Sequence, residues 1–228
     1  RDTRLVDPSG EARSIACVAG MNQHVVKPLF DRERRRLVVF DDHVVRVLDA
    51  DTLSATTPRS LLDVPVANAP ECRAAGLSPS GRRLAVYEQQ DDGGRVTVYD
   101  VDRGVQRAAL DLPTKLDDIT PLDDDETLVA SLDYGQGPVA IDLATGKRRW
   151  QFDGERDDRL ATAYDWAWSP DSMRFAVGRE RPTLYSWPAR ESIELAETGY
   201  YRAKCMVFSA DGTRLAASCD GTNVVYRI

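Results

Sequence analysis

The chain has 228 residues, of which 42% are hydrophobic and 29% are charged, and its formal net charge is −7 at pH 7. This composition is typical of an ordinary globular domain with one sizeable core. A phosphate-binding surface needs clustered Lys and Arg, and a membrane-spanning helix needs a much longer apolar run than any in this chain. We therefore expect neither a nucleic-acid partner nor a membrane.

The first elements in chain order are two short strand-like segments. Residues 3–7 have the pattern of the third strand of a unit that recurs later in the chain, and residues 11–18 have the pattern of a fourth strand. Strands built from β-branched and aromatic residues between turn signals are the expected element throughout.

One phrase then recurs along the chain. It reads SPSGRRLAV at 78–86, SPDSMRFAV at 169–177 and SADGTRLAA at 209–217, with weaker copies at 31–39 and 123–130. Pro fixes φ and Gly accepts positive φ, so each copy predicts a tight turn followed by a strand. The apolar anchors after these turns are Leu37, Leu84, Leu128, Phe175 and Leu215, spaced 47, 44, 47 and 40 residues apart.

A second phrase follows each copy and predicts another strand. It occupies residues 44–49, 96–100, 138–142, 182–186 and 223–227. In three copies a turn ending in Thr52, Gly104 or Gly146 comes next, and a further strand follows it. Each unit therefore consists of four strands joined by turns, and the units span about 24–67, 72–112, 116–153, 161–198 and 203–228. Such units of about 40–50 residues are typical of propeller blades.

These repeats resemble the WD-repeat and quinoprotein-like β-propeller superfamily over nearly the whole chain. The resemblance implies an all-β fold of four-stranded antiparallel blades, with about five blades visible, and a bacterial source. Two features depart from the strict WD family: the Gly-His pair is missing, and the third strands end in Tyr-Asp, Ile-Asp or Leu-Asp rather than Trp-Asp. The buried Asp-His-Ser-Trp network of that family therefore cannot form. Residues 142–150 look like a quinoprotein-type repeat, but no quinone-holding residues are identifiable, and we expect no cofactor.

Ring closure has two interpretations. Residues 11–18 could supply the fourth strand of the last blade and close a five-bladed ring, which would remove exposed sheet edges. Alternatively, the five blades are part of a larger ring.

Signals of catalysis are weak. The chain has two histidines, His24 and His43, and four cysteines without a CxxC pair, so we expect no metal site. No nucleophile elbow, zinc-protease motif or phosphate loop occurs. The carboxylate clusters fall in predicted turns, where Asp is favoured locally. Trp166 and Trp168 alternate on a predicted first strand, and packing between blades explains them best. We therefore expect a protein that is not an enzyme.

The candidate binding face is the one on which the second-to-third-strand loops and the blade-joining loops converge. Its candidate residues are Tyr134, Tyr200, Tyr201, Arg179, Arg181, Arg202, His43, Asp91 and Asp92. Aromatic and Arg side chains supply affinity at interfaces, while an acidic rim steers approach. The mixture predicts a protein or peptide partner with basic and apolar groups, docking with Tyr201 and Arg202 near its centre.

We therefore predict a non-catalytic protein-interaction platform, or a sensor or scaffold domain. The resemblance implies that relatives are fused to or associated with signalling, protease or ATPase components. The alternatives are a propeller enzyme of the lactonase or glycoside hydrolase type and a periplasmic binding propeller of the Tol-associated type. The expected location is the cytoplasm, or the periplasm if a leader was removed.

Overall fold

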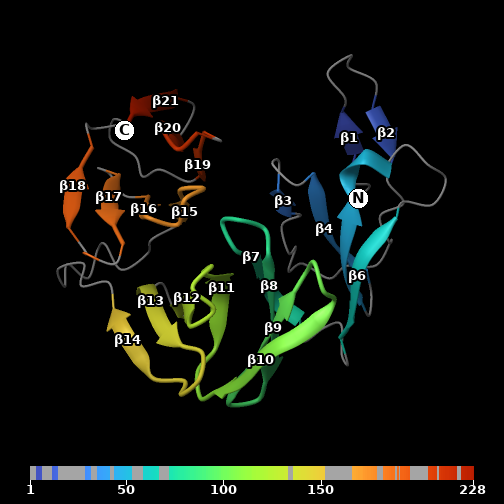
Figure 1. The fold of residues 1–228 in the computed structure, drawn as a ribbon. Helices are drawn as coiled ribbons and strands as arrows, with labels where there is room; N and C mark the ends of the chain where they lie inside the picture. The colour runs from blue at the N-terminus through green and yellow to red at the C-terminus, as the bar shows by residue number, and fades with distance from the viewer. Residues whose placement is uncertain are drawn as a thin grey trace.

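A computed structural model describes residues 4–6, 12–14, 29–31, 35–41, 44–52, 59–66, 72–132, 136–151, 166–178, 182–187, 189, 191–195, 205–209, 211–219 and 222–228. Apart from one short 3-10 helix, η1 (Ala50–Thr52), the regular elements in this part of the chain are β-strands. Five antiparallel sheets follow one another along an open arc (Figure 1), and a two-stranded sheet lies beside the first of them. No helix among the described residues is long and apolar enough to cross a membrane.

Each sheet is one blade, numbered here in chain order. Blade 1 contains β3 (Leu29–Asp31), β4 (Arg36–Asp41), β5 (Val44–Asp49) and β6 (Ser60–Pro65). Blade 2 contains β7 (Cys72–Leu77), β8 (Arg83–Gln90), β9 (Gly93–Asp100) and β10 (Val105–Leu112). Blade 3 contains β11 (Leu116–Pro121), β12 (Thr127–Leu132), β13 (Gln136–Asp142) and β14 (Arg148–Gln151).

Blade 4 contains β15 (Trp166–Trp168), β16 (Arg174–Val177), β17 (Thr183–Ser186) and β18 (Ser192–Glu194). Blade 5 contains β19 (Cys205–Phe208), β20 (Arg214–Cys219) and β21 (Thr222–Arg227). The strands of every blade pair with their chain neighbours, so each blade is a simple antiparallel meander. The expected all-β architecture of antiparallel propeller blades is confirmed.

The blades pack face to face because each strand alternates between two apolar sides. The five anchors, Leu37, Leu84, Leu128, Phe175 and Leu215, are all at most 5% exposed. Each anchor from Leu84 onward lies on the face of its blade that meets the preceding blade, here called the backward face. The residue after each anchor lies on the opposite, forward face. Val38 of blade 1 thus shares a cluster with Leu84 of blade 2, and Ala176 of blade 4 shares one with Leu215 of blade 5.

The first-to-second-strand turns share one backbone conformation. The residue three positions before the anchor has positive φ in blades 2 to 5: Gly81 at 67°, Asp125 at 61°, Ser172 at 60° and Gly212 at 67°. Gly adopts this conformation without steric cost, and Asp tolerates it better than most residues. The turn signal in the repeated phrase therefore has a direct backbone cause.

Among the residues that the structure describes, the two ends of the arc do not meet (Figure 1). Within the described residues β21 pairs only with β20. Residues 12–14 of the expected closing segment form β2 (Ala12–Ser14), which pairs with β1 (Arg4–Val6). Closure of the last blade by residues 11–18 stays a prediction.

Candidate interaction surface

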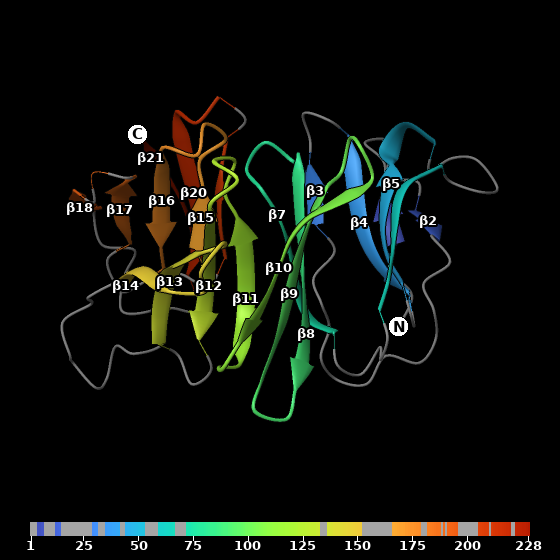
Figure 2. The ribbon, with the colours of Figure 1, turned by 60° about the horizontal axis from the view of Figure 1, so that its bottom comes forward.

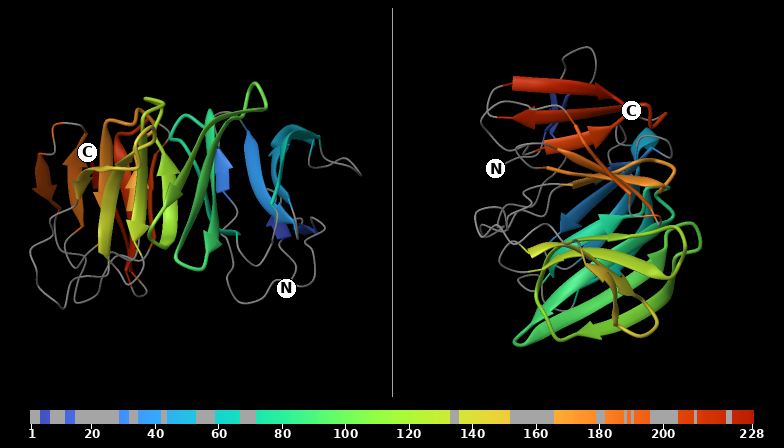
Figure 3. Two further views of the ribbon diagram at one scale, coloured as in Figure 1. Left: turned by 90° about the horizontal axis from the view of Figure 1, so that it is seen from below. Right: turned by 90° about the vertical axis from the view of Figure 1, so that its left-hand side faces the viewer.

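The antiparallel meander places successive turns of each blade at opposite ends of its strands. In Figure 3 the strands of neighbouring sheets stand side by side between two common ends. The first-to-second-strand and third-to-fourth-strand turns lie at one end, here called the latch face. The second-to-third-strand turns lie at the other end, here called the loop face. The candidate residues from the sequence belong to the loop face.

The best-described part of the loop face is the β8–β9 turn at the lower edge of Figure 2. Gln90 pairs with Gly93, so Asp91 and Asp92 alone form the tip, and both are exposed. Gly93 has φ near 155°, and a Cβ there would lie 2.0 Å from the backbone oxygen of Leu112. Only glycine fits at this close approach.

A buried tyrosine supports this turn from below. The Tyr87 side chain is 0% exposed, and its hydroxyl donates a 2.8 Å hydrogen bond to the backbone oxygen of Gly93. The Tyr87 ring also lies where a Cβ of Gly94 would have to be, 2.3 Å from Cε2. A satisfied buried polar group of this kind restricts the backbone above it. Asp91 and Asp92 are therefore presented on a rigid base.

The surroundings of the turn are charged on both strands. Next to it, Arg95 of β9 pairs with Asp111 of β10 at 3.1 Å, and both side chains are largely exposed. The opposite charges of Arg95 and Asp111 cancel, whereas Asp91 and Asp92 add two negative charges at the tip of the turn. A surface of this sign attracts Lys and Arg side chains during encounter.

The other predicted site residues lie outside the described residues: His43, Tyr134, Arg179, Arg181, Tyr200, Tyr201 and Arg202. Of the nine candidates the structure thus places Asp91 and Asp92, both in one exposed turn. No group of three or more His, Cys, Asp or Glu side chains in the described ranges is arranged to hold a metal ion.

The latch face contains a set of arginines to which the sequence alone gave no role. Each precedes an anchor and reaches forward to the next blade. Arg36 donates a 3.0 Å hydrogen bond to the backbone oxygen of Gly81 and pairs with Asp102. Arg83 bonds Asp125, and Arg174 donates a 3.1 Å hydrogen bond to the backbone oxygen of Gly212. We call these three residues the latch arginines. The sequence feature that could have pointed to these arginines is that Arg recurs at one position of the repeated phrase, directly before the anchor.

Asp123 adds a second connection between blades. Its carboxylate accepts 3.0 Å hydrogen bonds from the backbone N–H of Ser80 in blade 2 and from the hydroxyl of Ser172 in blade 4. One carboxylate thus ties the turns of three successive blades. The expected local role in a turn is seen for Asp124, which accepts a hydrogen bond from the Thr127 N–H. The bonds of Asp123 instead reach residues of two neighbouring blades.

The aspartates that end the third strands have a local role in place of the WD-family network. Asp142 accepts hydrogen bonds from the Thr145 N–H at 2.8 Å and from Arg149 Nη2 at 2.5 Å. The Arg149 bond, followed by the Thr145 hydroxyl, lowers the pKa of Asp142 to about 2. Asp100 is bonded by Arg107 at 2.9 Å, and this bond is the main cause of its lowered pKa.

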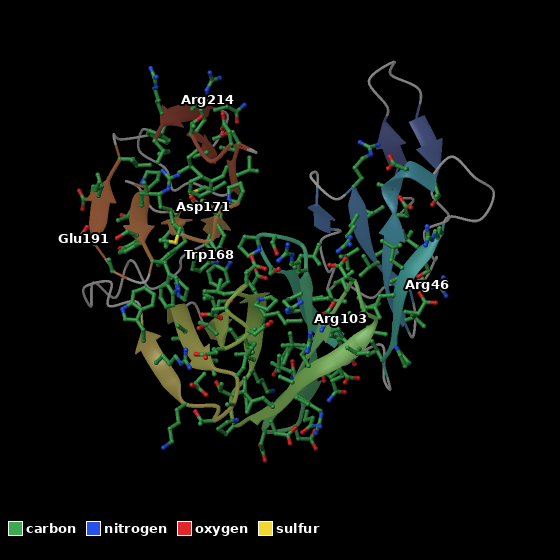
Figure 4. All side chains as sticks on the ribbon, viewed as in Figure 1. Arg46, Arg103, Trp168, Asp171, Glu191 and Arg214 are labelled. Carbon is green, nitrogen blue, oxygen red and sulfur yellow. The ribbon has the colours of Figure 1, made fainter. Side chains whose placement is uncertain are left out.

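An aromatic cluster fills the contact between blades 3 and 4. Trp168, labelled in Figure 4, lies 4.9 Å from Phe175 and 6.0 Å from Trp187 between ring centroids. Trp150 of blade 3 meets Phe175 edge to face at 5.7 Å. Edge-to-face and tilted contacts of this kind stabilise apolar cores. Trp168 packs against the same Phe175 cluster as Trp150 of blade 3, so it belongs to the core between blades, as the sequence predicts.

Comparisons with known proteins agree with this architecture. No family model matches the chain, and no curated protein matches it. Among solved structures, the chain is similar to the Cps50 (Swd1) β-propeller domain of Myceliophteria thermophila. The TM-score is 0.61 at 15% sequence identity, over 92% of this chain and 68% of that one. At this identity the likeness shows the fold alone: the protein is a β-propeller of antiparallel blades.

Proposed function

We propose that this protein is a non-catalytic protein-interaction platform whose loop face binds a protein or peptide with basic groups. The observation that carries the proposal is the β8–β9 turn. Two exposed carboxylates stand on a turn that a buried tyrosine and two glycines hold in one conformation. A pre-formed charged turn loses little conformational entropy on binding, which favours recognition.

The framework behind the turn supports the same function. The latch arginines and Asp123 join neighbouring blades, so the loop-face turns keep fixed relative positions. A rigid scaffold that presents loops is the usual basis of a binding surface. The resemblance to WD-like propellers, which the sequence repeats and the fold share, also favours a platform that acts within a larger protein or complex.

The proposal extends to the rest of the loop face. Tyr201 and Arg202 would supply the aromatic and guanidinium anchors near the centre of the contact, and Asp91 and Asp92 its acidic rim. Removing rim charges slows association and weakens its salt dependence, whereas removing anchors speeds dissociation.

The test uses the full chain with an affinity tag in an extract of its native host. Proteins bound to the wild type are identified and quantified by mass spectrometry, in parallel with the variants D91N/D92N and Y201A/R202A. The matched control is Glu191→Lys, which also changes the charge by two units. Glu191 is exposed beside the β17–β18 turn on the latch face (Figure 4).

We expect one partner to be depleted at least fivefold by each loop-face variant and to stay bound to E191K. Binding of the purified partner is then measured at two salt concentrations, and D91N/D92N should reduce the association rate more at low salt. Equal recovery of every partner by wild type and both loop-face variants would overturn the proposal.

A further inference from the structure

The contact between blades 3 and 4 differs from the other contacts in the residue that precedes the anchor. The three latch arginines belong to blades 1, 2 and 4, and each directly precedes its anchor. In blade 3 the residue before the anchor Leu128 is Thr127, whose hydroxyl donates a 2.7 Å hydrogen bond to Asp124 of the same turn. No guanidinium from this position therefore crosses from blade 3 to blade 4.

A hydroxyl makes the latch-face connection at this contact. Ser172 of blade 4 donates a 3.0 Å hydrogen bond to Asp123 of blade 3. By comparison, Arg83 reaches Asp125 with two nitrogen atoms, and Arg36 binds both a backbone oxygen and a carboxylate of blade 2. Paired bonds from a guanidinium are stronger than one bond from a neutral hydroxyl. The latch-face connection is therefore weaker between blades 3 and 4 than between the blades before them.

The apolar part of the same contact is less completely buried. Phe175 and Val177 are 1% and 0% exposed. The other described members of their cluster are large rings that stay partly exposed: Trp150, Trp168, Tyr185 and Trp187. Between blades 2 and 3 the anchor Leu128 lies instead among side chains such as Ala85 and Ile141, which are at most 2% exposed. Solvent thus reaches the edges of the rings that join blades 3 and 4.

Trp168 adds a buried donor to this contact. Its ring centroid lies 4.9 Å from that of Phe175 and 6.0 Å from that of Trp187. Its Nε1 atom is buried and has no hydrogen-bond partner among the described residues. A buried N–H without an acceptor destabilises the state in which it is buried, since water binds it only after exposure. The closed contact therefore carries a local cost that opening would relieve.

We propose that the contact between blades 3 and 4 is a joint of the arc, which opens while the blades themselves stay folded. Blades 1 to 3 then form one body, and blades 4 and 5 form the other. The closed state is the one described above, in which the loop-face turns keep their relative positions. Opening would separate the turns of the two bodies and would give the arc a second conformation. Such sub-global opening occurs where few contacts join cooperative units. The proposal does not depend on the function proposed above.

Thiol labelling of the full chain measures opening at two matched positions. Val177 and Val86 each stand two residues after an anchor and are at most 2% exposed. Val177 faces blade 3, whereas Val86 faces blade 1. Each is replaced by Cys in a separate variant and treated with iodoacetamide under native conditions. Mass spectrometry of peptides distinguishes the new thiol from the four native cysteines. A buried thiol reacts only when its surroundings open.

We expect V177C to be labelled at least about tenfold faster than V86C. Its labelling rate should depend little on low concentrations of urea, because opening of the joint exposes far less surface than global unfolding does.

A further variant supplies the missing arginine. Thr127→Arg places it beside Asp142 and Arg149, and Arg83 occupies the same position beside the equivalent pair in blade 2. The acceptor would be the backbone oxygen of Ser172, at the turn position whose oxygen two of the latch arginines bind. In the V177C background, T127R should slow labelling at least about fivefold.

The matched control is Thr213→Arg, the same replacement at an exposed latch-face position of blade 5. It should leave the labelling of V177C unchanged, and circular dichroism checks that all variants fold. Labelling of V177C no faster than that of V86C would overturn the proposal. A steep dependence of V177C labelling on urea, or a folded T127R variant that labels as fast as its parent, would also overturn it. If T127R does not fold, the comparison of V177C with V86C and its urea dependence decide.

Discussion

Arg83 of β8 connects two carboxylates that belong to different blades. Its Nη1 lies 3.2 Å from Asp100 in its own blade, and its Nη2 donates a 2.8 Å hydrogen bond to Asp125 in the turn of blade 3. The Arg83 side chain is only 12% exposed. The bond from Arg83 is also the main cause of the lowered pKa of Asp125. The blades are thus held together by charged groups at the latch face as well as by their apolar faces.

Replacing Arg83 by Met should destabilise the protein by about 2 kcal/mol or more, because a poorly exposed Asp100 loses one of its two guanidinium partners. The control is Arg95→Met, which removes an exposed pair with Asp111 and should cost less than about 1 kcal/mol. Urea unfolding of both variants measures the difference. Equal losses of stability for R83M and R95M would show that the contact of the latch arginine Arg83 with the next blade does not stabilise the protein.

The blade organisation could be predicted because its signals are local. The residue with positive φ, the anchor and the alternating strand all lie within one nine-residue phrase, so Leu84, Phe175 and Leu215 are recognisable without a structure. The β8–β9 turn was predictable for the same reason, since Asp91-Asp92-Gly93-Gly94 encodes its own conformation.

The contacts between blades could not be predicted in the same way. The partner of Arg83 lies 42 residues further along the chain, and Arg174 reaches 38 residues. Which side chains of two successive blades come into contact depends on the angle between their sheets. The pattern of residues along the strands does not predict this angle. The repeated Arg before the anchor is visible in the sequence, but only the packed blades show what it binds.

Replacing Phe175 by Ala should cost about 3–5 kcal/mol, since the ring is 1% exposed and packs against Trp150 and Trp168. Ile193→Ala on the exposed strand β18 should change stability by no more than about 0.5 kcal/mol. Guanidinium unfolding followed by tryptophan fluorescence measures both. A loss below about 1 kcal/mol for F175A would contradict the assignment of Phe175 as a core anchor.

The pKa of Asp142 predicts an acid-dependent loss of stability. Its folded-state pKa of about 2 is below the value near 3.9 that is usual for an unfolded chain. The carboxylate therefore stabilises the fold above about pH 4, and this stabilisation is lost as the pH falls towards 2. The urea midpoint of wild type should exceed that of D142N at pH 6, and the gap should narrow at pH 3. A gap that is constant between these values would show that Asp142 does not stabilise the fold through its charge.

Gly76 sets the spacing between blades 2 and 3. Replacing it by Ala should reduce the stability of the protein more than replacing a glycine that is needed only for its backbone conformation. A Cβ on Gly76 would lie 1.8 Å from the backbone oxygen of Ile119, an atom that cannot move without shifting β11. Gly76→Ala should therefore cost about 3 kcal/mol through overpacking. Gly104 has φ near 66° but nothing within 4 Å of its would-be Cβ, so Gly104→Ala should cost only about 1 kcal/mol. Thermal unfolding of both variants gives the comparison, and an equal or smaller loss for G76A would mean that the close approach of β7 and β11 is not rigid.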